Sequence, residues 1–223
     1  MWAEHAIKNT MLTVFGRATS SNVQALLWGL EELGLTYERL DFGEDFGGLD
    51  TPQFRAMNPH GKIPVLKVGE IALFETPAIL RYLATKHGAE TFWPRNPLDR
   101  AKIDMWAEWS KHDVAEAFTG PVFWEAIRKH PDRRDPNLIA CNIERFETAL
   151  TLAEPQLAGA HFLCGDHLTL ADIQFGHVLY RYFDAGLQRR SLPALERYYK
   201  RLILRPAYEK AVMVSYEALR DTL

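Results

Sequence analysis

The chain has 223 residues, 47% of them hydrophobic, which is enough apolar material for one compact unit or two small domains. Its formal net charge of −3 gives no general electrostatic reason to bind nucleic acid or an anionic membrane. No apolar run reaches membrane-spanning length, and residues 1–10 lack the apolar core of a signal peptide. The only cysteines, Cys141 and Cys164, lie far apart in apolar contexts, so we expect a cytoplasmic protein without a disulfide framework.

The first 88 residues mix strand-like and helix-like segments. The expected elements are a strand at 12–15, a helix at 21–33 stopped by Gly34, a strand at 37–41, a glycine-rich loop, a short helix at 51–56, strands around Val65 and Ala72, and a helix at 76–87. The first two strands should be parallel because a helix joins them, whereas the last two should form a hairpin that turns at residues 68–70. This is the order of elements in a thioredoxin-like α/β domain.

The rest of the chain is helix-like throughout. Residues 88–97 (GAETFWPRNP) interrupt the periodicity with two prolines, so we predict domains at 1–88 and 97–223. Within the second, an all-α bundle, helices are expected at 98–119, 137–158, 169–185, 192–201 and 206–218. Thr169 and Asp172 have the spacing of an N-terminal capping box.

The segment 58–76 (NPHGKIPVLKVGEIALFET) predicts a peptide-binding edge. Pro64 cannot donate to a sheet ladder, and a cis peptide bond before it would leave the backbone of Ile63 available to a peptide-like ligand. Thr76 is expected to be a helix N-cap with Pro77 at the first helical position, so that unpaired N–H groups lie beside Glu75. A carboxylate fits there, and Glu75 is placed to hold an ammonium group next to it.

The combination of NPHGKIP, a hairpin and the Glu75–Thr76 pair resembles the glutathione-binding half of the glutathione S-transferase family. The segment FLCGD followed by the capping box resembles the helical half of the same family, so the resemblance spans the chain. It implies a thioredoxin-like domain followed by a helical bundle, of the bacterial type. It also implies a cytoplasmic, homodimeric detoxification enzyme that activates the thiol of glutathione for conjugation to a hydrophobic electrophile.

A free thiol, with a pKa of about 8.5, is only a few per cent ionised at neutral pH, so the enzyme must stabilise the sulfur anion. The resemblance assigns this to the loop GRATSSNV, where serine-type classes place the activating hydroxyl at a position that matches Ser20. Some bacterial and fungal relatives use an asparagine two places later, which is Asn22, and Ser21 is the least favoured candidate. Without the resemblance, each of these residues would be interpreted as a helix cap. The loop contains neither tyrosine nor cysteine, which disfavours the tyrosine-type and thiol-transferase classes.

For the rest of glutathione, the resemblance implies that the backbone of Ile63 pairs with the cysteinyl part and that Lys62 contacts the glycyl carboxylate. It assigns Glu75 and Thr76 to the γ-glutamyl end. Many members carry a basic residue in the loop that corresponds to residues 42–51, but this chain has none there.

The second substrate is expected where the helical domain faces the loop of Ser20, with Trp109 and His112 as the candidates in an aromatic-rich stretch. Two other hypotheses remain at this stage. One is a glutathione-dependent disulfide or peroxide reductase that uses Asn22, and the other is a non-catalytic regulatory protein of the same fold. No metal-ligand or nucleotide-binding spacing occurs, so glutathione is the only small molecule implied besides the electrophile.

Overall fold

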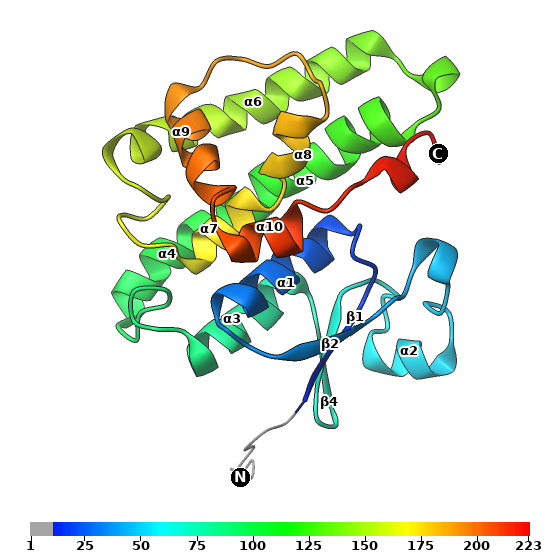
Figure 1. The fold of residues 1–223 in the computed structure, drawn as a ribbon, viewed down its shortest axis with the longest axis vertical. Coiled ribbons are helices and arrows are strands. Elements are labelled where there is room, and N and C mark those ends of the chain that lie inside the picture. Colours follow the sequence, from blue (N-terminus) through cyan, green and yellow to red (C-terminus); the bar gives the residue numbers. More distant parts are fainter. Residues whose placement is uncertain (1–10) are drawn as a thin grey trace.

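In the computed structural model, which describes residues 11–223, a small sheet with three helices is followed by helices alone (Figure 1). Residues 1–10, for which the sequence predicts no signal peptide and in which the first predicted domain begins, lie outside the described residues. The strands are β1 (Leu12–Phe15), β2 (Tyr37–Leu40), β3 (Val65–Val68) and β4 (Ile71–Phe74). Their order is β2-β1-β3-β4, with β1 parallel to β2 and β3 antiparallel to both of its neighbours, as predicted.

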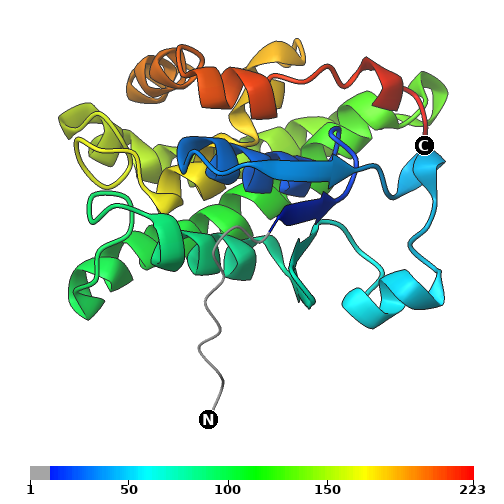
Figure 2. The ribbon, with the colours of Figure 1, turned by 60° about the horizontal axis from the view of Figure 1, so that its bottom comes forward.

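Three helices accompany the sheet: α1 (Ser21–Glu32), α2 (Pro52–Met57) and α3 (Thr76–His87). Figures 1 and 2 show α1 between the sheet and the helices of the second half. This explains why α1 is buried on almost every side, including Val23, Leu26 and Leu30 at 0% exposure. A helix that is apolar all round requires neighbours all round.

The second half contains α4 (Pro97–Trp109), η2 (Ser110–Ala115), α5 (Glu116–Phe118), η3 (Thr119–Arg128), α6 (Pro136–Gly159), α7 (Leu170–Gly176), α8 (Leu179–Asp184), α9 (Pro193–Leu202) and α10 (Pro206–Val212). Short 3₁₀ turns lie at η1 (Glu44–Phe46), η4 (Pro131–Arg133) and η5 (Glu217–Leu219). The two domains predicted from the sequence correspond in type to these α/β and helical halves.

Three predicted helix boundaries were wrong. The helix expected to end at Thr119 continues to Arg128, because the wider π-helical turns of η3 accommodate Gly120 and Pro121. The helix expected over 169–185 is divided into α7 and α8 by a turn at His177. The last helix ends at Val212 rather than 218, and Tyr216 is buried from a non-helical segment, which periodicity cannot distinguish from a helix.

Helix α1 joins the two halves. Trp28 packs edge-to-face on Tyr208 of α10, with ring centroids 4.8 Å apart. A Cβ atom at Gly176 of α7 would lie 2.9 Å from the Trp28 ring and 2.7 Å from Leu202, so only glycine allows this close approach. The halves therefore share one continuous core.

The capping box at the start of α7 is confirmed. Asp172 is fully buried, and its carboxylate accepts hydrogen bonds from the backbone N–H of Thr169 (2.8 Å) and Leu163 (2.9 Å). The hydroxyl groups of Thr169 (2.9 Å) and Tyr198 (3.1 Å) complete its environment. Asp172 thus fixes both the helix start and the loop before it.

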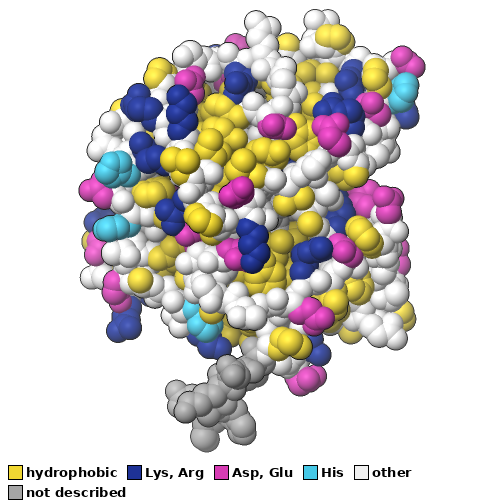
Figure 3. Space-filling view, viewed as in Figure 1, with side chains coloured by type: hydrophobic (Ala, Val, Ile, Leu, Met, Phe, Trp, Pro, Cys, Tyr) yellow, Lys and Arg dark blue, Asp and Glu magenta, His cyan; other side chains and the backbone are white. Residues whose placement is uncertain are grey.

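Over residues 11–223, no helix has both the length and the apolar character needed to cross a bilayer. On the face in Figure 3, Lys and Arg side chains are interspersed with Asp and Glu side chains. This mixture agrees with the small net charge of the chain.

Candidate active site

The peptide-binding edge predicted at Ile63 is available to a ligand. The Ile63–Pro64 peptide bond is cis, as expected, and lies just before β3. Within the described part of the chain, neither the N–H nor the C=O of Ile63 bonds to another backbone group. Gly16 lies against this residue, since a Cβ atom there would be 3.2 Å from the Cβ of Ile63. An extended peptide can therefore pair with Ile63 at this point.

The start of α3 differs from the prediction in its cap. The N-cap is Glu75, and Thr76 is already the first helical residue, because its hydroxyl points to α1 and donates to the carbonyl of Asn22 at 3.5 Å. Glu75 has φ 67° and ψ 110°, a conformation that costs about 1–3 kcal/mol in a residue other than glycine and that often marks a functional position. Its side chain is exposed beside the helix start.

Ser20 is the N-cap of α1. Its Oγ accepts from the N–H of Val23 at 3.5 Å, a long contact that occupies only a lone pair. No described residue accepts the hydroxyl hydrogen. The capping role and a role as donor to a thiolate are therefore compatible, and the residue can fulfil both.

Asn22 connects the loop of Ser20 to the helical half. Its Oδ1 accepts from the ammonium group of Lys111 in η2 at 3.3 Å, and its backbone carbonyl accepts from Thr76. The side chain of Lys111 is 16% exposed. The carbonyl-type oxygen of Asn22 is thus already used by a cation, whereas Ser20 has no competing partner for its proton.

Further positive charge surrounds this loop. Arg181 of α8, only 3% exposed, donates from Nη2 to the carbonyl of Thr19 at 2.7 Å. Burial and, to a smaller extent, the nearby charge of Arg17 lower the pKa of its guanidinium to about 10. No acidic residue lies in the first turn of α1, whose N-terminus itself carries partial positive charge. The site is therefore electropositive and suits an anion such as a thiolate.

Lys62 and the glycine-rich loop flank the other end of the edge. The backbone carbonyl of Lys62 accepts from Nδ2 of Asn58 at 2.8 Å, which fixes the turn and leaves the ammonium group exposed. A hollow of about 530 Å³ is lined by Gly43, Glu44 and residues 47–51, none of them basic.

Trp109 and His112 lie elsewhere. They line a hollow of about 520 Å³ with residues of η2 and α6, and no described residue before Pro97 contributes to it. The ring of Trp109 stacks on Phe175 with centroids 5.8 Å apart, as part of the packing of α7. The structure therefore does not bring these two side chains together with Ser20. From η2, Lys111 approaches the loop instead.

Sequence reasoning missed Lys111 and Arg181, which bond to the loop of Ser20, and Arg128, which pairs with Glu44. They follow the loop of Ser20 by roughly ninety to one hundred and sixty positions, and no motif distinguishes them from surface cations. Only their burial identifies them, with Arg128 and Arg181 at 3% exposure. A charged residue between hydrophobic neighbours, such as Arg181 between Tyr180 and Tyr182, was the one available signal.

A cis-proline edge facing two helix N-termini, joined to a helical bundle, defines a thioredoxin-like protein with a thiol or peptide site. Residues 10–85 match the family described as "Glutathione S-transferase, N-terminal domain", and residues 115–201 match "Glutathione S-transferase, C-terminal domain". The chain belongs to the glutathione S-transferase family and is of the bacterial type.

The known relatives match this chain along almost its whole length. The chain is 34% identical to glutathione S-transferase GstB of Escherichia coli, over 92% of this chain and 99% of the relative. It is 32% identical to glutathione S-transferase 4 of Zea mays, over 88% and 90% of the two chains. A theta-class glutathione S-transferase of Xanthomonas axonopodis pv. citri, solved with glutathione bound, superposes with a TM-score of 0.87 at 37% identity, over 93% and 99%. These similarities favour a transferase over the reductase and the non-catalytic protein.

Proposed function

We propose that this glutathione S-transferase holds the glutathione thiolate with the hydroxyl of Ser20 and directs it at a hydrophobic electrophile. One observation carries the proposal: the Ser20 hydroxyl lies at the N-terminus of α1 with its hydrogen unclaimed by any described residue. The cations Arg181 and Lys111 bond to the residues around it. In the reaction, the sulfur forms a bond to the electrophilic carbon, and the leaving group departs with its bonding electrons.

Glutathione itself would lie along the edge described above. We propose that the backbone of Ile63 pairs with its cysteinyl part and that Glu75 and Thr76 receive the γ-glutamyl end. The exposed carboxylate of Glu75 suits the ammonium group, and the N-terminus of α3 suits the carboxylate. Lys62 is assigned to the glycyl carboxylate, because it is the cation next to Ile63.

In this proposal residues 1–88 bind glutathione and residues 97–223 supply the second-substrate side. We propose a cytoplasmic role in detoxification, which the two unpaired cysteines support. We also propose a homodimer through residues 78–87 and 103–117, where Met105 is 60% exposed. Light scattering at micromolar concentration tests the dimer, and a mass of 25.6 kDa would contradict it.

Retention on immobilised glutathione, followed by conjugation to 1-chloro-2,4-dinitrobenzene, tests the activity. Ser20→Ala should reduce turnover at neutral pH about ten- to a hundred-fold, the value of one hydrogen bond to a charged group. The pKa of the bound thiol, followed by the ultraviolet absorbance of the thiolate, should rise, and glutathione affinity should change little.

Ser21→Ala is the matched control, since it removes a neighbouring hydroxyl without touching the cap. It should leave the thiol pKa unchanged. An unchanged pKa in Ser20→Ala together with a raised one in Asn22→Ala would transfer the role to Asn22.

A further inference from the structure

Three arginine side chains meet beside the loop of Ser20. Arg17 comes from the loop after β1, Arg128 from the end of η3, and Arg181 from α8. Arg128 and Arg181 are each 3% exposed, and the side chain of Arg17 is 14% exposed. After burial, the strongest influence on the pKa of Arg181 is the charge of Arg17, and Arg128 lowers it as well, so these like charges lie within electrostatic range of one another.

A single carboxylate is paired with this cluster. One oxygen of Glu44 accepts from Arg17 at 3.0 Å and from Arg128 at 3.1 Å, and the other accepts from Arg128 at 3.2 Å. Asp45 is exposed and adds only a longer-range influence on Arg17. Arg181 forms no ion pair with any residue of the described chain. Two of these three nearly buried cations therefore share one carboxylate and the third has none, and burying cations without partners is unfavourable.

Two guanidinium nitrogens of the cluster have no hydrogen-bond partner among the described residues. The Nε atoms of Arg17 and Arg181 are buried, and no residue from 11 to 223 bonds to them. Both arginines lie next to the proposed thiolate site: Arg17 is close to Ser20 along the chain, and Arg181 is close to the same loop in space. The carbonyl of Arg17 accepts from the N–H of Ser20 at 3.1 Å, and Arg181 donates to Thr19.

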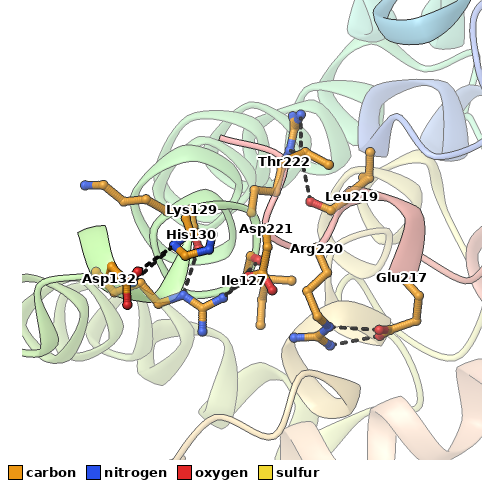
Figure 4. Close-up of polar contacts among 11 residues, drawn as sticks. Ile127, Lys129, His130, Asp132, Glu217, Leu219, Arg220, Asp221 and Thr222 are labelled. Atoms are coloured by element: carbon orange, nitrogen blue, oxygen red, sulfur yellow. Dashed lines mark hydrogen bonds and ion pairs between the residues drawn. The ribbon is translucent and has the colours of Figure 1, made fainter.

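The C-terminal segment holds Arg128 in position. Figure 4 shows this segment, with Asp221 and Thr222, beside Ile127 and Lys129. The N–H of Asp221 donates to the carbonyl of Ile127 at 3.1 Å, and the hydroxyl of Thr222 accepts from the guanidinium of Arg128 at 3.3 and 3.4 Å. Arg128 is thus a fixed, preorganised donor rather than a mobile surface side chain.

Aromatic rings border the same cluster. The guanidinium of Arg181 lies 4.6 Å from the ring centroid of Phe123, and that of Arg128 lies 5.5 Å from the ring of Trp124. Trp124 is 45% exposed, so an apolar surface open to solvent adjoins the buried cations. A molecule with an aromatic body and one negative group matches this arrangement.

We propose that the second substrate is an aromatic electrophile that carries a carboxylate, and that Arg17, Arg128 and Arg181 bind this carboxylate in place of Glu44. The inference rests on the proposed function and names the class of electrophile that it uses. Glu44 is displaceable: it has φ 51°, lies between Gly43 and Gly47, and borders the hollow of about 530 Å³ into which its side chain can turn. The carboxylate of the substrate is not altered by the reaction.

The test compares 4-chloro-3-nitrobenzoate with 4-chloro-3-nitrobenzamide, which share ring and leaving group and differ in charge. In both, the thiolate sulfur bonds to the ring carbon that bears chlorine, and chloride departs with the bonding electrons. The measured quantity is the kcat/KM for the benzoate divided by that for the benzamide. Because this ratio is compared between variants, the intrinsic reactivity of the two compounds cancels.

Arg17→Gln should lower the ratio about ten-fold, as expected for the loss of one charged hydrogen bond. Glu44→Gln should raise it several-fold, because the competing internal carboxylate is removed. A damaged fold cannot produce this increase in the ratio. The Glu44→Gln variant therefore still tests the inference if Arg17→Gln is unstable. Arg95→Gln removes a remote cation paired only with Glu90 and should leave the ratio unchanged.

Three outcomes overturn the inference. If Arg17→Gln and Glu44→Gln leave the ratio unchanged while the benzamide is turned over, the substrate class is wrong and the proposed function stands. If Arg17→Gln instead raises the KM for glutathione equally with both compounds, the arginines bind the glycyl carboxylate. If the unmodified protein conjugates neither compound nor 1-chloro-2,4-dinitrobenzene, the proposed function fails and the inference fails with it.

Discussion

The two ends of helix α1 are built from opposite charges and are neutralised to different degrees. Its C-terminal end carries Glu31 and Glu32, whose negative charge is unfavourable near the negative end of the helix dipole. Every carboxylate there has partners. Glu32 accepts from Arg205 at 2.7 and 2.6 Å and from the indole N–H of Trp28 at 2.9 Å. Glu31 accepts from Tyr37 and pairs with Lys210 at 2.6 Å.

The N-terminal end has cations near the positive end of the dipole, which is equally unfavourable. Lys111 and Arg181 bond to neutral groups, the side chain of Asn22 and the carbonyl of Thr19. Among the described residues, two carboxylates supply a direct counter-charge: Glu44, which pairs with Arg17 and Arg128, and the exposed Glu116, which lies 3.7 Å from the ammonium group of Lys111. The comparison teaches that the carboxylates at one end of the helix are paired within the chain, whereas the cations at the other end are paired less completely, which is why we propose that this end binds an anion.

Removing an ion pair at the C-terminal end of α1 should have the largest effect on stability. Arg205→Met leaves the carboxylate of Glu32, whose side chain is 9% exposed, with the indole of Trp28 and no cation. We expect a loss of about 3 kcal/mol in the free energy of unfolding, measured by urea denaturation, because an almost buried charge loses its partner.

Lys210→Met is the control at the same end. Its ion pair with Glu31 is similar in length, but the lysine side chain is 66% exposed, so the expected loss is below about 1 kcal/mol. Equal losses in the two variants would show that burial does not decide the strength of these pairs.

Acid should weaken the protein through His177, which lies at the positive end. Burial, together with the charges of Lys111 and Arg181, lowers the pKa of His177 to about 3, so the folded state takes up its proton much later than the unfolded state, which does so near 6.5. Stability is present above pH 6.5 and falls as the pH decreases. Between pH 6.5 and 5 the loss from this group should be about 2 kcal/mol.

His177→Gln checks the assignment, since glutamine keeps a polar side chain but does not titrate. Urea denaturation at several pH values should show a smaller dependence on pH in this variant than in the unmodified protein. An identical dependence in both proteins would assign the acid sensitivity to other groups.

The smallest predicted effect concerns Lys111. Lys111→Met removes one cation near the thiolate without removing the hydroxyl of Ser20, so the pKa of the bound thiol should rise by roughly 0.5 and turnover at neutral pH should fall a few-fold. Turnover should recover at high pH, where the thiol ionises unaided. Lys102→Met, which removes a lysine paired with Asp99 on the surface of α4, should change neither quantity.

Part of the candidate site could be predicted from the sequence, because it depends on residues that are close together along the chain. The cis bond before Pro64, the cap at Ser20, the turn at Gly69 and the box of Thr169 and Asp172 each depend on residues within a few positions of one another. The cap of α3 was assigned to Thr76 instead of Glu75 because the hydroxyl of Thr76 serves a neighbour more than fifty positions away. A local rule cannot predict which of two adjacent residues a distant element will use.

The sequence by itself determined the order of strands and helices and the family, since periodicity, turn residues and short motifs act through neighbours along the chain. Tertiary structure alone decided where the charges lie. Arg181 comes to Thr19 across 162 positions and Arg128 to Glu44 across 84, while Trp109 and His112, although promising in composition, lie in a different hollow. The reason is physical: the electrostatic effect of a side chain depends on its burial and its neighbours in space, and neither property is encoded in its spacing along the chain.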